Sequence, residues 1–331
     1  MPAKMTKPSD EINIEEYMET LRKKVDERLD YIMERYEFLE FLEPIRYTMA
    51  GTKGGKKIRP TLATMICQSL GGQSDDKTLE VSVIVELVHQ GSLVIDDIID
   101  GDAERRGQQA MWMIQQVGGT AVTGLIMFLA ANKIGLHRVP RAKNLVMEVV
   151  EALAKGNKID MEGFGWDEKR YNDMIYLKTA YLYGAAAKFG AIMADASDEV
   201  VAKSFEYGKN IGMVYQLVDD LTDILKTEKM NILIGDMKRG KVTLTQIDMF
   251  NKDKKSHKLL EKFRAKQFTQ EDIPEFFKLS HKIGSINVVN DAVSAHLNSA
   301  LSVLQSFPNN RYTNALKVLP EYMKNALMKE V

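Results

Sequence analysis

The chain has 331 residues, 45% of them hydrophobic, so it is long enough to bury a substantial core. Its 45 lysines and arginines nearly balance 46 aspartates and glutamates, which does not favour nucleic acid or an anionic membrane surface as a partner. A single cysteine, Cys67, excludes an internal disulfide framework and indicates a reducing compartment.

The start of the chain lacks the apolar segment of a signal peptide. The longest apolar stretch, residues 121–131, is far shorter than the roughly 20 residues that a membrane-spanning helix needs. We therefore expect a cytoplasmic protein without a transmembrane segment.

Helical patterns follow one another along the chain, because prolines are few and Met, Ala, Leu, Glu and Lys are frequent. The first predicted helix covers residues 15–42. Residues 250–285 resemble solvated outer helices. Breaks rich in glycine, proline or asparagine separate the helix-length segments, at residues 50–60, 69–76, 135–144, 161–168 and 307–311. The apolar side chains of the first helix recur at three- and four-residue steps, namely Met18, Leu21, Val25, Leu29 and Ile32.

Aspartates interrupt apolar runs at two places. Asp96, Asp97 and Asp100 form the first cluster, and the same Asp-Asp-x-x-Asp pattern recurs over residues 219–223. Side chains four residues apart share one helix face, so Asp96 and Asp100 are predicted to project together. Two facing acidic clusters would repel each other unless cations lay between them, and oxygen ligands suit a hard ion such as Mg²⁺. The pair predicts a metal-bound diphosphate, whereas either motif alone is also compatible with a solvated helix end.

Basic residues accompany the aspartates. Lys56 and Arg59 follow a glycine-containing loop, and Arg105 and Arg106 come one turn after the first cluster. Arginine holds phosphate oxygens through two parallel hydrogen bonds, so these residues indicate a second anion pocket. His89 lies about two turns before the first aspartates on roughly the same face, as a core residue or as a donor to phosphate.

Five sequence blocks in this order and spacing resemble the trans-isoprenyl diphosphate synthases, or polyprenyl synthetases. The resemblance implies an all-α, isoprenoid synthase-type helical bundle around a central apolar cavity. It implies one domain over residues 1–331, with a core over about 50–247, an N-terminal helix over 15–42 and C-terminal helices over 250–331. The blocks are GGKKIRP, ELVHQGSLVIDDIIDGDAERRG, KTAYLYGAAAKFGA, GMVYQLVDDLTDIL and GDMKRGKVTLTQI.

The resemblance also implies an activity. This is the Mg²⁺-dependent, head-to-tail condensation of isopentenyl diphosphate with an allylic prenyl diphosphate, with three Mg²⁺ ions per site in a homodimer. No protein nucleophile is required, because the metals and cations stabilise the leaving diphosphate.

Each matching position takes an implied role. The metal ligands are Asp96, Asp100, Asp219, Asp220 and Asp223. The allylic diphosphate is held by Arg105, Lys178, Thr179, Gln216 and Lys241, and isopentenyl diphosphate by Lys56, Arg59, His89 and Arg106. The catalytic set is Asp96, Asp97, Asp100, Arg105, Lys178 and Asp219. Three positions depart from the family pattern: Leu125 replaces an aspartate, Asn157 a glutamine or glutamate, and Asn231 a lysine.

The length of the product depends on the residues that precede the first motif. Gly91 and Ser92 lie about 6 to 7.5 Å down the helix from Asp96, where short-product members carry aromatic rings. Small residues there would let the growing chain pass towards Val88. We expect a product longer than C15, geranylgeranyl diphosphate (C20) first and C25 or longer as the alternative, unless Met127 and Phe128 on another helix form the stop.

Two other functions fit parts of the pattern. A terpene cyclase would share the helical architecture and the first motif, but it normally replaces the second motif and lacks the basic isopentenyl pocket. A non-catalytic partner subunit of a prenyl synthase would tend to lose the aspartates, and this chain keeps all six.

Overall fold

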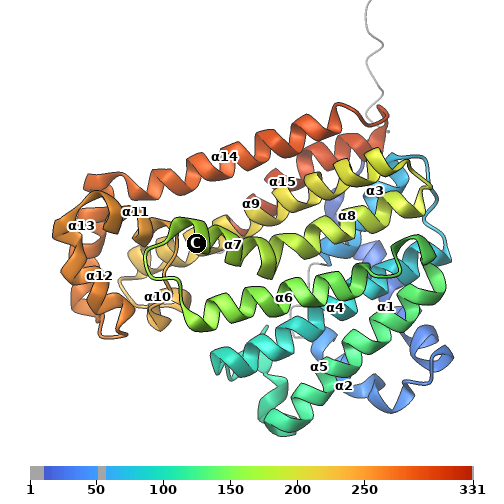
Figure 1. Ribbon diagram of the computed structural model, residues 1–331, viewed down its shortest axis with the longest axis horizontal. Helices are drawn as coiled ribbons and strands as arrows, with labels where there is room; N and C mark the ends of the chain where they lie inside the picture. Colours follow the sequence, from blue (N-terminus) through green and yellow to red (C-terminus); the bar gives the residue numbers. More distant parts are fainter. Residues whose placement is uncertain (1–10, 51–56, 330–331) are drawn as a thin grey trace, which may run out of the picture.

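The computed structural model describes residues 11–50 and 57–329. Helices form nearly all of its regular structure, as the sequence predicts (Figure 1). The strands in this part of the chain are β1 (Glu104–Arg105) and β2 (Gln108–Gln109), which pair antiparallel directly after the first aspartate motif. Their short hairpin turns the chain back beside that motif.

The N-terminal helix is shorter than predicted. Helix α1 spans Ile14–Arg35. Asn13 is its N-cap residue, and the Asn13 side chain accepts the backbone N–H of Glu16. Its predicted apolar face is buried. The helix predicted over 15–42 stops early because Glu37 adopts a left-handed conformation (φ 64°). The chain continues as a 3₁₀ turn, η2 (Leu39–Phe41), and helix α2 (Leu42–Ala50).

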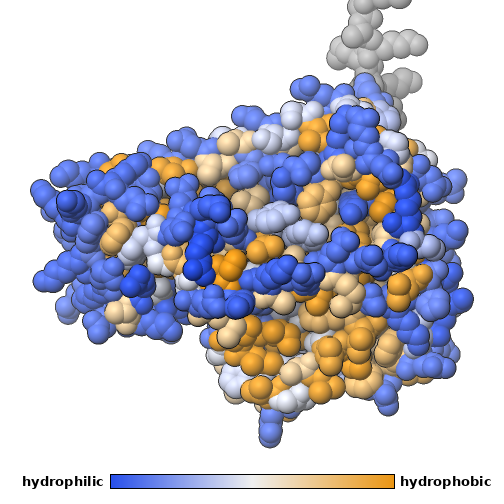
Figure 2. Space-filling view, in the orientation of Figure 1, coloured by the Kyte–Doolittle hydropathy of each residue, from blue (hydrophilic) through white to orange (hydrophobic). Residues whose placement is uncertain are grey.

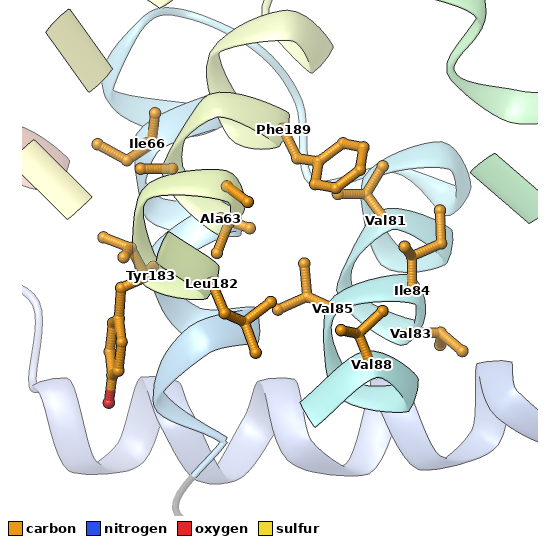
Figure 3. Close-up of a cluster of buried hydrophobic side chains, with 14 of the residues drawn as sticks. Ala63, Ile66, Val81, Val83, Ile84, Val85, Val88, Leu182, Tyr183 and Phe189 are labelled. Atoms are coloured by element: carbon orange, nitrogen blue, oxygen red, sulfur yellow. The ribbon is translucent and has the colours of Figure 1, made fainter. Parts of the chain in front are cut away.

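Long helices form the centre of the molecule. In Figure 3, side chains of α3, α4 and α8 point towards one another, with Leu182 near Val85 and Phe189 near Val81. This apolar layer holds the helices that carry the candidate site. The elements in chain order are α3 (Ile58–Ser69), α4 (Asp76–Asp100), α5 (Met111–Arg138), η3 (Pro140–Ala142), α6 (Leu145–Glu162), α7 (Glu168–Ile175), the π-helix η4 (Tyr176–Ala180), α8 (Tyr181–Met193) and α9 (Asp198–Met230).

Two glycines let the central helices approach at backbone distance. A Cβ at Gly190 of α8 would collide with the carbonyl oxygen of Ala63 in α3. A Cβ at Gly208 of α9 would collide with the carbonyl oxygen of Tyr183 in α8. Because only glycine fits these contacts, α8 is held tightly between α3 and α9.

The C-terminal third is less solvated than predicted. Phe263 and Phe276 are fully buried in a second hydrophobic cluster with Leu217 and Leu221 of α9, so the expectation of outer, solvated helices over 250–285 is wrong for their inner faces. Figure 1 shows α14 running along the bundle beside α9. The elements are α10 (Gly235–Arg239), α11 (Leu244–Lys252), η5 (Lys254–Ser256), α12 (His257–Arg264), η6 (Gln270–Asp272), α13 (Ile273–Ile283), α14 (Ser285–Leu304) and α15 (Arg311–Met328).

Helix α5 leaves an apolar face uncovered. Both α4 and α5 are long and apolar enough to cross a membrane by length and composition, but the α4 segment is 78% buried inside the bundle and the α5 segment only 28%. Figure 2 shows the apolar surface on the lower part of the molecule, where α5 lies in Figure 1. The side chains, each 47–56% exposed, are Met113, Ile114, Val117, Val122, Leu125, Leu129 and Leu136.

Candidate active site

A polar cavity of about 390 Å³ opens where the two aspartate motifs face each other. Helix α4 and the β1 hairpin line one side, while η4, α9 and residues 236–243 line the other. Most of the predicted site residues therefore meet in one place. They are Arg59, His89, Ser92, Asp96, Asp100, Arg105, Arg106, Lys178, Thr179, Gln216, Asp219, Asp220 and Lys241.

The first motif divides its three aspartates between two directions. Asp96 and Asp100 line the cavity, as the four-residue spacing predicts. Asp97 is buried instead and accepts the Nε–H of Arg105 at 2.8 Å. Burial raises the pKa of Asp97, and the Arg105 guanidinium opposes that rise. Asp97 therefore holds Arg105 in place rather than facing the cavity.

Asp96 has the features of a carboxylate that lacks a ligand. Its Oδ1 is buried without a hydrogen-bond partner in the described part of the chain, and the Lys178 Nζ lies 3.9 Å away. Burial raises the pKa of Asp96, although Lys178 and Asn157 lower it in part. A buried carboxylate oxygen that accepts no hydrogen bond costs about 1–3 kcal/mol, and a bound cation would offset this cost.

The aspartates of the second motif, on α9, also differ in exposure and in hydrogen-bond partners. Asp219 is exposed and lines the cavity. Asp220 accepts the Tyr171 hydroxyl at 2.6 Å and the Gln216 amide at 2.8 Å, and Thr179 in turn donates to Gln216 at 2.7 Å. Burial, reinforced by the nearby Asp236 carboxylate, raises the pKa of Asp220 to about 7.

Asp223 lies beyond the cavity lining and accepts the backbone N–H of Asp236. It thereby fixes the segment that begins α10 and leads to Lys241. Together these contacts leave Asp219 as the most exposed carboxylate of the second motif, while the predicted ligands Asp220 and Asp223 also hold neighbouring segments.

Two cations of the site share one carboxylate that the sequence analysis did not single out. The Asp160 Oδ2 lies 2.6 Å from the Lys178 Nζ and 3.4 Å from the Lys241 Nζ. Burial alone would raise the pKa of Asp160, but Lys241 and Lys178 hold it below its usual range. Asp160 lies three residues after Asn157 on α6, so the helical spacing from that departure was the signal that could have found it.

The π-helix η4 sets the direction of Lys178 and Thr179. It lies between α7 and α8, and a Cβ at Gly156 of α6 would stand 2.7 Å from the Lys178 backbone nitrogen. The close approach of α6 brings Asp160 to the lysine. Single π turns inside helices are frequent at functional sites, where they redirect side chains.

Three of the four residues predicted to bind isopentenyl diphosphate line the cavity, namely Arg59, His89 and Arg106. Arg59 lies 3.1 Å from the His89 Nε2 and stacks over the Tyr183 ring at 4.3 Å. Burial, with Arg59 and Arg106 beside it, lowers the pKa of His89 well below its usual value, so the ring is neutral and accepts from Arg59. Lys56 lies outside the described residues.

Lys57, next to Lys56 in the basic block, belongs to the core. It is buried and donates to Glu86 at 2.8 Å, with Asp26 of α1 at 3.6 Å. Glu86 also accepts from Gln90 at 2.6 Å. The glutamate is therefore the partner of a buried lysine, and this contact ties the start of α3 to α1 and α4.

The carboxylates suit a hard divalent cation but do not form a complete cage. Asp96, Asp100 and Asp219 offer oxygen ligands of the kind Mg²⁺ prefers. Over the described ranges, no three Asp, Glu, His or Cys side chains lie together in a group that could hold an ion alone. Water molecules and phosphate oxygens commonly complete the coordination shell of Mg²⁺ at sites with one or two carboxylates.

The model of the polyprenyl synthetase family matches residues 40–280. The chain belongs to this family. A geranylgeranyl diphosphate synthase of Methanosarcina mazei is 30% identical over 299 residues, 86% of this chain and 90% of that one. A geranylgeranyl pyrophosphate synthetase structure from Pyrococcus horikoshii has a TM-score of 0.81 and 26% identity, over 94% of this chain and 98% of that one.

A polyprenyl synthase of Caulobacter crescentus, whose structure holds calcium and isoprenyl diphosphate, has the same fold. Its TM-score is 0.78 at 22% identity, over 96% of this chain and 99% of that one. The protein is thus a prenyltransferase of the polyprenyl synthetase family. Similar proteins are named for products from short chain to geranylfarnesyl and decaprenyl diphosphate, so similarity does not fix the product length.

Asp160→Asn tests the shared carboxylate in this prenyltransferase. Removing its charge frees the Lys178 and Lys241 ammonium groups, and charge-assisted hydrogen bonds are worth about 1.5–3 kcal/mol. We expect kcat/KM for the allylic substrate to fall roughly ten- to hundredfold in steady-state assays. Glu162→Gln is the matched control on the same helix, because Glu162 makes exposed ion pairs with Lys158 and Arg170. Equal activity of the two variants would contradict the role given to Asp160.

Proposed function

We propose that this prenyltransferase condenses isopentenyl diphosphate with an allylic prenyl diphosphate, head to tail, to an all-trans product longer than C15, with Mg²⁺ as its metal. One observation carries the proposal. A single cavity contains carboxylates of both aspartate motifs, the two lysines that share Asp160, and the separate Arg59 and His89 pair.

The two sets of cations support two diphosphate positions. Lys178, Thr179, Gln216 and Lys241 lie around the carboxylates and suit the allylic diphosphate, together with Arg105. Arg59 and Arg106, together with the neutral His89, form a second region that suits isopentenyl diphosphate and that Lys56 would complete. Asp96, Asp100 and Asp219 would hold the metal ions, with Asp220 and Asp223 behind them.

The residues supply positioning and charge rather than a nucleophile. The C1–O bond of the allylic substrate breaks and the diphosphate leaves with the electron pair. The double bond of isopentenyl diphosphate then forms a new bond to C1, and a proton is lost from its C2 to the released diphosphate. Bound Mg²⁺ neutralises charge on the leaving diphosphate. Lys178 and Lys241 stabilise the same charge through preorganised donors.

Purified protein incubated with labelled isopentenyl diphosphate and C5, C10 or C15 allylic diphosphates tests this activity directly. We expect Mg²⁺-dependent elongation, with chelation of the metal abolishing it and C20 as the main product by chain-length analysis. Absence of elongation from every starter, in protein shown to be folded, would refute the proposal and favour a non-catalytic partner subunit.

The floor of the product path involves two helices. Gly91 and Val88 of α4 are buried, and Ser92 lines the cavity. A Cβ at Gly91 would stand 2.7 Å from the Phe128 ring of α5, so the ring occupies the space that the small residue leaves. We propose geranylgeranyl diphosphate as the main product, with Phe128 as the stop beside Gly91.

Phe128→Ala should lengthen the main product, because removing the ring opens the path beside Gly91. Chain-length analysis of the extracted prenyl alcohols measures the shift towards C25 or longer. Leu301→Ala is the control, since Leu301 is 37% exposed on α14, away from the α5 face. A product spectrum unchanged in Phe128→Ala would show that the ring does not limit the chain.

The uncovered face of α5 supports a homodimer. No charged residue occurs between Met111 and Asn132, and Leu125, at one of the departures from the family pattern, is 56% exposed within this face. An apolar surface without charge suits burial against a second copy of itself.

The double substitution Leu125→Glu with Leu129→Glu places two charges on this apolar face and should convert a dimer to a monomer in sedimentation equilibrium. A monomeric wild-type protein would contradict the proposal.

A further inference from the structure

Arg239 lies in the wall of the catalytic cavity, although the sequence analysis gave it no role. It ends helix α10 and lines both the 390 Å³ cavity and an adjoining cavity of about 600 Å³. Its side chain is 37% exposed, so it is half-buried among acidic groups. The guanidinium is therefore within the volume that the two aspartate motifs enclose.

The contacts of Arg239 connect the two acidic segments. Its Nη1 donates to Asp102, which follows the first motif, at 3.0 Å. Its Nη2 donates at 2.7 Å to Asp236, whose backbone N–H in turn donates to Asp223 of the second motif. Asp102 also lies 3.7 Å from Arg105. Arginines and aspartates thus alternate across the mouth of the cavity.

One nitrogen of Arg239 has no hydrogen-bond partner in the described part of the chain. It is the Nε, which is buried. Burial of an unsatisfied charged donor is costly, so an acceptor is expected at this position. Asp102 and Asp236 each take one N–H, from Nη1 and Nη2, and two phosphate oxygens would match the fork that Nε forms with a neighbouring Nη.

A departure at Asn231 strengthens this interpretation. Asn231 stands where the family resemblance predicts a lysine, and it is exposed at the end of α9 in a left-handed conformation (φ 51°) that suits asparagine. That position therefore supplies no positive charge. Arg239 brings a cation from the neighbouring α10 into the same acidic cavity.

We propose that Arg239 is a diphosphate-binding residue of this chain, which turns from the carboxylates of Asp102 and Asp236 to the allylic diphosphate when the substrate enters. The proposal rests on the proposed prenyl condensation, because that reaction supplies the diphosphate. The other role that the contacts allow is a clasp between the two acidic segments, without contact to the substrate.

The first experiment measures binding without turnover. Isothermal titration calorimetry with inorganic diphosphate in the presence of Mg²⁺ compares wild type with Arg239→Gln, Arg239→Lys and Lys238→Gln. We expect Arg239→Gln to weaken affinity at least tenfold and Arg239→Lys to weaken it less, because lysine keeps the charge but not the fork. Lys238, exposed on the same short helix, is the matched control and should leave affinity unchanged. Wild-type affinity in Arg239→Gln would overturn the proposal.

A second variant separates binding from a clasp. Asp102→Asn breaks the carboxylate contact but leaves the guanidinium in the cavity, so a diphosphate-binding Arg239 predicts unchanged or tighter binding. If Asp102→Asn weakens diphosphate as much as Arg239→Gln does, the residue is only a clasp and the proposal fails.

Kinetics add a readout that a structural role would not give. In Arg239→Gln the KM for the allylic substrate should rise at least tenfold and the KM for isopentenyl diphosphate should change little, whereas equal changes in both would count against the proposal. Wild-type protein that binds diphosphate through Arg239 but never elongates would refute the condensation and leave the binding role intact.

Discussion

Repulsion between the two aspartate motifs is the constraint on which this site depends. Two like charges 4 Å apart near a protein surface repel by about 4 kcal/mol, and this cavity gathers at least six carboxylates. The fold offsets that cost by giving several of them a partner in the chain. Asp220 accepts from Tyr171 and Gln216, and Asp102 and Asp236 accept from Arg239. Outside the cavity lining, Asp97 accepts from Arg105 and Asp160 pairs with two lysines. The carboxylates left towards the cavity, Asp96 above all, are those a metal-bound diphosphate would complete.

That arrangement depends on the fixed positions of the central helices relative to one another. The motif on α4 can face the motif on α9 only if the helices between them do not shift, and the glycines of α8 and α9 leave no space for a different packing. The same logic applies to α6, where Gly156 brings Asp160 up to Lys178. The apolar layer in Figure 3 thus determines the spacing of charges several turns away.

The sequence predicted what local spacing controls. The helical class, the apolar face of α1 and the shared direction of Asp96 and Asp100 follow from periods of three and four residues. Contacts between distant segments were not predictable in this way. Tyr171 and Asp220 are 49 residues apart and Arg239 and Asp102 are 137 apart, so no pattern within one helix joins them. The prediction of solvated helices over residues 250–285 was wrong for a related reason. Charged residues are frequent in this segment, and they obscured the apolar pattern of the buried Phe263 and Phe276.

The residues of a single helix are likewise not enough to predict the length of the product. Counting back from Asp96 along α4 identifies Gly91 as a small residue, and from that helix alone the path is open. The facing helix adds the second boundary, because the Phe128 ring of α5, which the sequence analysis named as a possible stop, lies against Gly91. A small residue on one helix and a large one on its neighbour can enclose the same volume as the reverse pair. The floor of such a path is therefore formed by a contact between two helices. A rule that considers the residues of α4 alone omits the contribution of α5.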